Sequence, residues 1–303
     1  MIEYTVVIPV KDRNRNLACS LMALAKQTFP TDRWEVLVAD GSESDFALPT
    51  VARYADALNI RYLWWMDGTG NPGARKTWAA HNAQGEALVF VDSDVVLNER
   101  ALAAHDRLHR KWPNAIICGR YDWLMPMDVR EEDIAERFDA VVSNRLPLIA
   151  PATGGPLPGV DPRFQDERTR EWDEPSRTSK AGKPFALGVF GGNLLIPKAL
   201  FMEAGGFDPE IRGHGGEDSC LGWKLQKMGA EAVFSEEVIG WHVWHPRRQV
   251  ENEESVKRNI EYIERKYHDL HVKYGVIADP DSNMEYNDDG LFVPPDKREE
   301  LGI

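Results

Sequence analysis

Short apolar runs alternate with stretches of helical spacing through the first hundred residues, and this alternation constrains the fold most strongly. Residues 4–10, 34–40 and 87–91 (YTVVIPV, WEVLVAD and ALVFV) are rich in β-branched residues, as expected of strands buried on both faces. Strands joined by helices pair in parallel through right-handed crossovers. We therefore predict an α/β fold, a single large domain with a mainly parallel sheet flanked by helices.

Composition narrows the function classes. The chain has 303 residues, of which 43% are hydrophobic, and a formal net charge of −13, which argues against nonspecific binding to nucleic acid or anionic lipid. No apolar run approaches the roughly 18–20 residues of a membrane span, and no signal peptide precedes the first strand. Three widely spaced cysteines, Cys19, Cys118 and Cys220, suggest buried thiols in a reducing compartment, so we expect a cytoplasmic protein.

A pair of carboxylates stands in an apolar stretch. In VFVDSDVVL, residues 89–97, an apolar strand carries Asp92 and Asp94 to its carboxyl end, where parallel sheets bind ligands. Two like charges this close repel each other, and a divalent cation with oxygen ligands removes the repulsion. The alternative is a polar strand end that caps the next helix.

Three further segments carry polar groups at a predicted strand end or helix start, and one of them suits a phosphate-bearing ligand. Asp40 ends the second strand, and the segment NPGARK places Gly73 and Arg75 where a helix begins. Backbone N–H groups at a helix start and a guanidinium both suit phosphate oxygens. The glycine-rich segment GHGGEDSC presents Glu217 and Asp218 on the first turn of another helix, although favourable helix-start electrostatics alone would also explain this pair.

Histidines complete the set of candidate ligands. In WHVWHP, strand alternation places His242 and His245 on opposite faces, so only one can face the site; we favour His245, because the proline after it marks the strand end. A packed core histidine is the alternative, and we expect core packing for Trp241 and Trp244. His214 is placed on the acceptor side. On helix surfaces we expect His81, His105 and His109.

The rest of the chain divides by composition. Residues 151–184, rich in Pro, Gly and charge, are a lid or a surface insertion. Residues 251–272 form a charged amphipathic helix that docks on the domain, and the acidic tail that follows receives no chemistry. The predicted organisation is one domain over 1–247, followed by a carboxyl-terminal extension over 248–303. Within the domain, 1–120 form a nucleotide-binding half and 185–247 an acceptor or catalytic half.

In order and spacing these segments resemble the inverting glycosyltransferases of family 2, which have the nucleotide-sugar fold called GT-A. The block FGGNLLIPKALFMEAGGFDPEIRGHGGEDSCLGWKL resembles the carboxyl-terminal part of β-1,4-galactosyltransferases, with some likeness to polypeptide N-acetylgalactosaminyltransferases. The resemblance covers about residues 3–247. It implies metal-dependent transfer of a sugar from a nucleoside-diphosphate sugar, a UDP-sugar, to a hydroxyl of a glycan, protein or small-molecule acceptor, with inversion.

The resemblance also implies roles on the donor side. Asp40 would bind the uracil, Arg75 the pyrophosphate, and Asp92-Ser93-Asp94 the Mn²⁺ (or Mg²⁺) and the nucleotide. This chain departs from many relatives at two positions: Ala39 stands where they carry a second aspartate, and Lys76 stands where they carry an asparagine. To the nucleotide-sugar site we further assign Pro9, Gly73, Ser93, Gly192 and Asn193.

On the acceptor side, Asp218 matches the general base and Glu217 the residue that contacts the acceptor or the donor sugar. The helix N-terminus is expected to keep Asp218 ionised and to lower its basicity. A histidine is the third metal ligand in the galactosyl and polypeptide-acceptor relatives, and His242 and His245 compete for that position. The alternatives are a retaining transferase of the polypeptide N-acetylgalactosaminyl type, or a module that binds nucleotide sugars or glycans without turnover.

Overall fold

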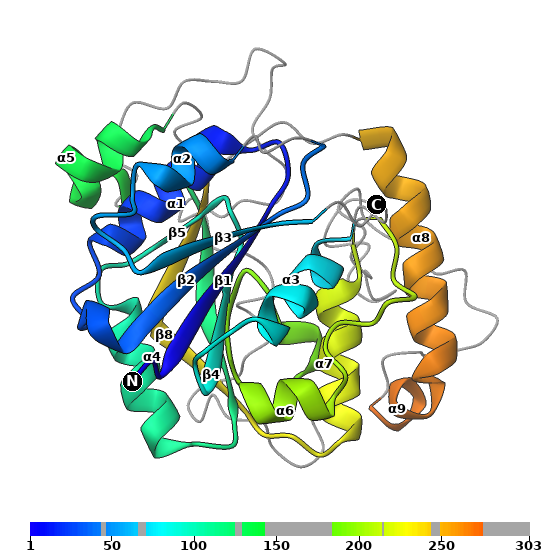
Figure 1. Cartoon of the computed structure of the whole chain (residues 1–303). Helices are drawn as coiled ribbons and strands as arrows, with labels where there is room; N and C mark the ends of the chain where they lie inside the picture. The colour runs from blue at the N-terminus through cyan, green and yellow to red at the C-terminus, as the bar shows by residue number, and fades with distance from the viewer. Residues whose placement is uncertain are drawn as a thin grey trace.

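The computed structural model describes residues 1–43, 47–65, 71–124, 129–142, 184–213, 215–243 and 249–274. Its centre is an eight-stranded sheet with the strand order β3-β2-β1-β4-β7-β6-β8-β5 (Figure 1). The strands are β1 Tyr4–Val10, β2 Trp34–Asp40, β3 Ile60–Trp64, β4 Ala87–Val91, β5 Val95–Leu97, β6 Ile116–Leu124, β7 Asn193–Pro197 and β8 Ala232–Val243. The α-helices are α1 Asn14–Ala25, α2 Leu48–Ala52, α3 Pro72–His81, α4 Ala101–Lys111, α5 Glu131–Val142, α6 Lys198–Glu203, α7 Glu217–Lys227, α8 Gln249–Lys266 and α9 His268–Lys273.

The amino-terminal half of the sheet is parallel. β1 pairs in parallel with β2 and β4, and β2 pairs in parallel with β3. Every residue of β1, β2 and β4 is buried, because helices cover both faces of these strands. The predicted parallel α/β sheet is therefore confirmed, and its strands bring their carboxyl ends to one edge.

The second half of the sheet departs from this pattern. β7 runs antiparallel between β4 and β6, and β8 pairs in parallel with β6 and antiparallel with β5. Two short apolar runs, residues 232–235 and 238–243, form the single strand β8 although Glu236 and Glu237 stand between them. Its register with β6 shifts after Gly119, opposite the exposed Glu236 and Glu237, so the polar interruption marks an irregularity rather than a strand end.

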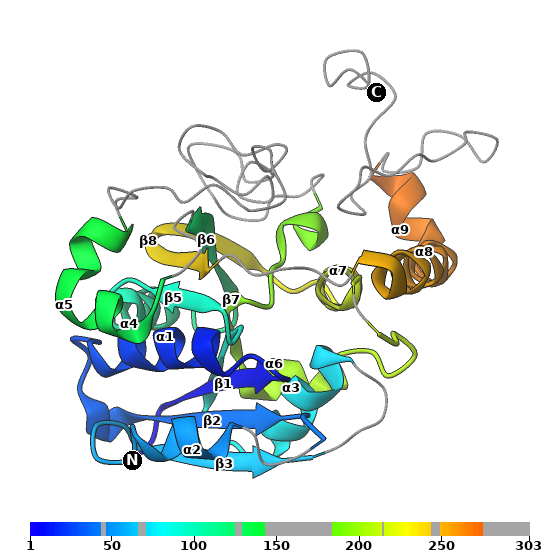
Figure 2. The same cartoon turned by 90° about the horizontal axis from the view of Figure 1, so that it is seen from above.

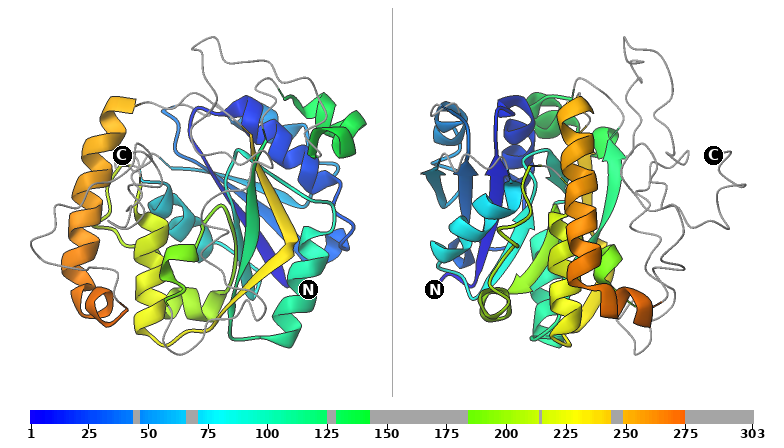
Figure 3. Two further views of the ribbon diagram at one scale, coloured as in Figure 1. Left: turned by 180° about the vertical axis from the view of Figure 1, so that it is seen from behind. Right: turned by 90° about the vertical axis from the view of Figure 1, so that its right-hand side faces the viewer.

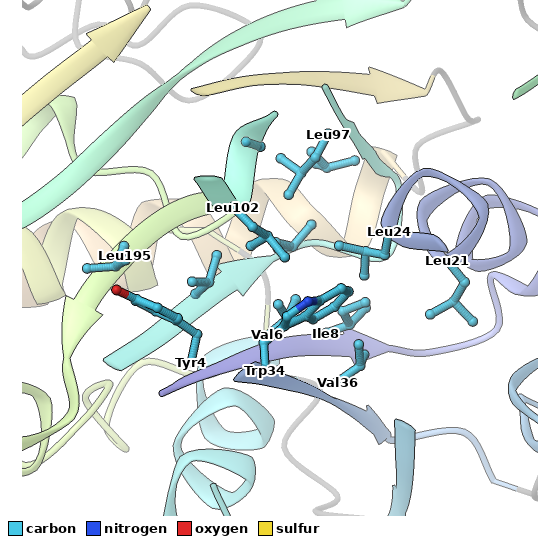
Figure 4. Packing of buried hydrophobic residues seen from close by; sticks show 14 of the residues in the cluster. Tyr4, Val6, Ile8, Leu21, Leu24, Trp34, Val36, Leu97, Leu102 and Leu195 are labelled. Carbon is cyan, nitrogen blue, oxygen red and sulfur yellow. The ribbon is translucent and has the colours of Figure 1, made fainter. Parts of the chain in front are cut away.

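Two layers of helices enclose the sheet (Figures 1 and 2). On one face, α1, α2 and α4 pack on alternate residues of the strands, such as Val6 and Ile8; Figure 4 shows part of this core. On the other face, α3, α6 and α7 pack on the intervening residues, such as Val7 and Leu37. Helices on both sides leave only the strand ends free to form a ligand site.

The carboxyl-terminal helix α8 lies beside α7, on the outside of the domain (Figures 2 and 3). Ile263 of α8 and Tyr267 pack with Cys220 and Trp223 of α7 in one buried cluster. The predicted docking of this amphipathic segment is therefore confirmed. Residues 151–183 of the predicted loop, and the acidic tail from 275, lie outside the described residues. In the described parts of the chain, no helix is both long enough and apolar enough to cross a membrane.

Candidate active site

The Asp92-Ser93-Asp94 segment is a turn between β4 and β5, rather than the middle of one long strand. The N–H of Val95 donates to the carbonyl of Asp92 at 3.0 Å, which closes the turn. From α1, the hydroxyl of Ser20 donates to the carbonyl of Ser93 at 3.0 Å. The backbone of the turn is thus held, and its two aspartate side chains point to different partners.

Asp92 forms an ion pair with Lys76, the residue that stands where many relatives carry an asparagine. Nζ of Lys76, on α3, lies 2.8 Å from Oδ1 of Asp92 and donates to the carbonyl of Gly191 at 2.9 Å. The side chain of Lys76 is 1% exposed and that of Asp92 is 29% exposed. Burial lowers the pKa of Lys76, but the charges of Asp92, Asp218 and Glu217 outweigh it and raise the pKa above its ordinary value. Lys76 is therefore a charged residue inside the site.

Glu217 and Asp218 begin α7, directly after Gly216, whose φ of +86° favours glycine. A Cβ atom on Gly191 would lie 2.2 Å from Oδ1 of Asp218 and 3.0 Å from Nζ of Lys76. The backbone at Gly191 therefore passes between the aspartate and the lysine, and only glycine fits there. As a result, residues far apart in sequence meet here: Lys76 and Asp92 on one side, Glu217 and Asp218 on the other.

The carboxyl group of Asp218 has an unusual affinity for protons. Burial is the main cause that raises its pKa to about 6, and the charges of Glu217 and Asp92 add to it, against the lowering effects of Lys76 and a backbone hydrogen bond from Gly191. Burial also raises the pKa of Glu217. The expectation that the helix N-terminus lowers the basicity of Asp218 is therefore wrong, because burial and neighbouring like charges outweigh the helix dipole.

Asp94 lies beside a histidine of β8. Its Oδ1 is 3.5 Å from Nε2 of His242, and its Oδ2 is 3.5 Å from Nη1 of Arg13. The backbone supports this pairing, because the N–H of Val243 donates to the carbonyl of Asp94 at 2.7 Å. His245 and Trp244, like His214, lie outside the described residues, so the choice between His242 and His245 stays a prediction. Trp241 packs on Phe138 in the core, as expected.

A divalent cation fits this donor set in part. Asp94 and His242 offer a carboxylate oxygen and an imidazole nitrogen close together, and both types suit ions of the Mn²⁺ class. Asp92 instead forms an ion pair with Lys76. Across the described ranges, no three His, Cys, Asp or Glu side chains are grouped closely enough to hold an ion. A third ligand would therefore require Asp92 to turn from Lys76, or a residue from the segment after 243.

The start of α3 lies against the end of β2. Asn71 caps the helix, with its Oδ1 accepting from the N–H of Gly73 at 2.7 Å, so this particular N–H is already occupied. A Cβ atom on Gly41 would lie 2.6 Å from Cδ of Arg75, which shows that the arginine side chain runs closely over the residue after β2. Arg75 therefore lies against the residue that follows Asp40, and the role of the two in one binding site stays a prediction.

Asp40 itself is fully buried and organises the loop that follows it. Its Oδ1 accepts from the N–H of Ser42 at 2.9 Å, and its Oδ2 accepts from the N–H of Ala47 at 3.1 Å and the hydroxyl of Tyr62 at 2.8 Å. These three bonds give the carboxylate a role inside the protein. Its contact with a uracil stays a prediction.

The other predicted donor-site residues lie at different distances from the Asp92–Asp94 turn. Gly192 lies next to the turn, because a Cβ atom there would be 2.8 Å from Oδ2 of Asp92. Pro9 is buried in β1 opposite Ala39. Asn193 is buried inside the sheet, where its Nδ2 donates to the carbonyls of Arg120 at 2.9 Å and Val238 at 3.2 Å. Asn193 therefore ties β7 to β6 and β8, and its contact with a nucleotide sugar stays a prediction.

Sequence reasoning placed one histidine wrongly. His105 is fully buried, not on a helix surface, because with Ala101 and Leu108 it occupies the face of α4 that packs on the sheet. Burial, with a smaller effect of His109, lowers the pKa of His105 to about 3, so this ring is neutral at physiological pH. His109 is half-buried and His81 is exposed, as expected for the latter.

Comparisons with known proteins agree with this fold. Residues 5–144 match the family model described as Glycosyl transferase family 2. That range contains β1 to β6 and the Asp92–Asp94 turn. The chain has the GT-A type of fold, and the family match covers somewhat less than half of its residues.

Among particular proteins, the chain is 29% identical over 273 residues to validoxylamine A glucosyltransferase from Streptomyces hygroscopicus subsp. limoneus, covering 88% of this chain and 57% of that protein. It is similar in structure to S. aureus TarS 1–349 in complex with UDP-GlcNAc, with a TM-score of 0.61 and 15% identity over 90% of this chain and 73% of that one. A mannosyltransferase from Pyrobaculum calidifontis, in complex with GDP-Man and Mn²⁺, has a TM-score of 0.53 and 19% identity, covering 99% of this chain and 68% of that one. The chain spans only 57% and 61% of the two validoxylamine A glucosyltransferases it matches.

Proposed function

We propose that this chain is a metal-dependent glycosyltransferase that moves a sugar from a UDP-sugar to an acceptor hydroxyl, with inversion at the anomeric carbon. The observation that carries the proposal is the meeting of three carboxylates at Lys76: Asp92 of the strand-end turn, and Glu217 with Asp218 at the start of α7. The match to Glycosyl transferase family 2 and the likeness to a glucosyltransferase support sugar transfer as the reaction.

Asp218 is the proposed general base. Direct displacement at an anomeric carbon needs a group that takes the proton of the attacking hydroxyl on the side away from the leaving diphosphate. A pKa of about 6 leaves Asp218 mostly ionised at neutral pH and more basic than an ordinary aspartate. Glu217, which is more deeply buried, is proposed to hold the acceptor or the donor sugar in place.

For the metal, we propose Asp92, Asp94 and one of His242 and His245 as the ligands of Mn²⁺ or Mg²⁺. A bound divalent cation would offset the negative charge that develops on the leaving diphosphate. The partial fit of Asp94 with His242 supports this assignment, as does the Mn²⁺ named with the P. calidifontis mannosyltransferase. Arg13, 3.5 Å from Asp94, places a further cation at the same turn.

For the donor, we propose UDP rather than another nucleoside diphosphate, since the TarS structure is a complex with UDP-GlcNAc. Arg75 and the start of α3 are proposed to bind the pyrophosphate, and the loop ordered by Asp40 to border the base. The likeness of the 190–225 block to galactosyltransferases stays part of this proposal, as does a cytoplasmic location, which the three buried, unlinked cysteines support.

The test is release of UDP from UDP-glucose and UDP-N-acetylglucosamine, with and without Mn²⁺, with water as the acceptor. We expect turnover that needs Mn²⁺ and that Asp218→Asn removes while UDP binding persists. UDP binding without turnover of either donor would favour a binding module. NMR of the sugar first released decides the stereochemistry, because retention of the anomeric configuration would contradict the proposed base.

A further inference from the structure

The helix α8 contacts the glycine-rich turn that precedes α7. We define this turn as residues 212–216, of which the structure describes Arg212, Gly213, Gly215 and Gly216. It leads directly into Glu217 and Asp218, and the first hydrogen bond of the helix joins the N–H of Cys220 to the carbonyl of Gly216 at 2.8 Å. A displacement of the turn therefore displaces the two carboxylates.

Asn259 of α8 bonds to both sides of this turn. Its Nδ2 donates to the carbonyl of Arg212 at 3.0 Å and to that of Gly215 at 2.8 Å, and its Oδ1 accepts from the N–H of Arg212 at 3.4 Å. The asparagine itself is 1% exposed, so its amide is fully committed to the turn. Nη2 of Arg258 also donates to the carbonyl of Arg212, at 2.6 Å. Asn259 is the side chain that joins this carbonyl to that of Gly215, and its amide therefore favours one conformation of the turn.

Steric contact with α8 restricts the turn further. Gly215 and Gly216 have φ values of +89° and +86°, a region that other residues rarely adopt. A Cβ atom on Gly215 would lie 2.6 Å from Cγ2 of Val256, and one on Gly216 would lie 3.1 Å from Cδ1 of Ile263. The backbone of the turn thus rests directly on the side chains of α8, with no room for side chains of its own.

A second contact holds the segment that enters the turn. The Oδ2 atom of Asp208 accepts from the hydroxyl of Tyr262 at 3.2 Å and also from Nζ of Lys266, while its Oδ1 accepts from the N–H of Glu210 at 3.0 Å. Tyr262 lies in α8 close to Asn259 in sequence. One helix therefore holds the chain both before and within the turn.

We propose that Asn259 is a positioning residue for sugar transfer, which acts through the glycine-rich turn to place Asp218 against the acceptor hydroxyl. The proposal rests on the proposed function, because it takes Asp218 to be the base. In this proposal α8 positions a catalytic group, in addition to packing on the domain. Small displacements of a reacting group can cost about 10²-fold in rate, and none of these hydrogen bonds involves Arg75 or Asp40, which are proposed to border the nucleotide.

The test compares Asn259→Asp and Asn259→Ala with the wild type in the full chain. Asn259→Asp keeps the shape and the Oδ acceptor but replaces the N–H donors by an oxygen that faces two carbonyls. Glu261→Ala, an exposed change two residues further along α8, is the matched control. Measurements are UDP release from UDP-N-acetylglucosamine with Mn²⁺, UDP affinity by calorimetry, and hydrogen exchange of the amides in 212–220.

For both Asn259 variants we expect faster exchange in 212–220, a kcat lowered roughly 10- to 100-fold and an unchanged UDP affinity; Glu261→Ala should match the wild type in all three. A turn that exchanges faster without loss of kcat, or exchange that stays the same, would overturn the proposal. So would kcat and UDP affinity falling together with the folded fraction, because that result indicates a structural role. Asp218→Asn in the same assay keeps the two proposals distinguishable. If the Asp218→Asn variant retains turnover, the proposed function fails. The hydrogen-exchange data still report whether Asn259 holds the turn.

Discussion

Nζ of Lys76 and Oδ1 of Asp92 lie 2.8 Å apart in a part of the site where the lysine is almost completely enclosed by protein. The lysine belongs to α3 and the aspartate to the turn after β4, so this ion pair joins that helix to the sheet. The same ammonium faces Asp218 and Glu217. A buried cation surrounded by three carboxylates balances part of their charge, and its loss should be felt both in stability and in function.

Lys76→Met should destabilise the protein, because it keeps the aliphatic chain and removes the ammonium charge that opposes Asp92, Asp218 and Glu217. Breaking a buried ion pair typically costs about 3–5 kcal/mol, and we expect about 2–3 kcal/mol here because Asp92 is partly exposed to solvent screening. Denaturant unfolding measures this difference. Lys257→Met, an exposed change on α8, is the control and should be neutral; equal stabilities of the two variants would contradict a structural ion pair.

Asp218→Asn should lower kcat for UDP release while UDP affinity persists. The amide keeps the shape of the side chain but cannot accept the proton, and general-base catalysis is typically worth about 10²–10⁴-fold. Glu217→Gln should act on KM for the sugar substrate more than on kcat. The opposite pattern, with an active Asp218→Asn and an inactive Glu217→Gln, would reverse the roles of the pair, and full activity in both would leave only helix-start electrostatics.

The pKa of Asp218 predicts opposite pH dependences for activity and stability. The base works when ionised, so kcat should rise with pH through about 6 and level off above it. Between the ordinary value of 3.8 and about 6 the folded protein binds more protons than the unfolded chain, so the free energy of unfolding should fall as pH rises. Above pH 6, Asp218→Asn should therefore be more stable than the wild type. A variant less stable at pH 7, or a wild-type rate flat from pH 5 to 8, would contradict the raised pKa.

Asp94→Ala should abolish Mn²⁺-dependent UDP binding and leave the fold intact. It removes the carboxylate that lies 3.5 Å from Nε2 of His242, whereas the backbone bond from Val243 to the carbonyl of residue 94 does not depend on the side chain. Calorimetry with UDP, with and without Mn²⁺, measures the effect, and circular dichroism checks the fold. Undiminished Mn²⁺-dependent affinity in the folded variant would falsify the metal assignment.

One of His242→Ala and His245→Ala should weaken Mn²⁺ binding strongly, and the other should not. The sequence predicts strand alternation through 245, and such alternation would turn the two rings to opposite faces and let only one reach Asp94. The sequence favours His245 through its proline neighbour, whereas the described structure places His242 beside Asp94. Titration of each variant with Mn²⁺ decides between them. Small, equal losses would mean that neither histidine is a ligand.

Local patterns were enough to predict the parallel half of the fold. Buried β-branched runs, helical spacing and strand–helix alternation are properties of neighbouring residues, so β1, β2, β4 and the docking of α8 could be read directly. The sequence also indicated that Asp92, Asp94, Glu217 and Asp218 belong to one site, because strand ends and helix starts in such a sheet meet at one edge.

Tertiary structure alone decided how these groups act on one another. Lys76 and Gly191 are 115 residues apart, and no local pattern shows that the lysine Nζ and the glycine backbone meet between Asp92 and Asp218. The pKa of Asp218 likewise depends on burial and on charges from other segments, which reversed the effect expected from the helix terminus. Sequence determines which residues are polar, small or charged, whereas desolvation and charge interactions depend on distances that exist only once the chain has folded.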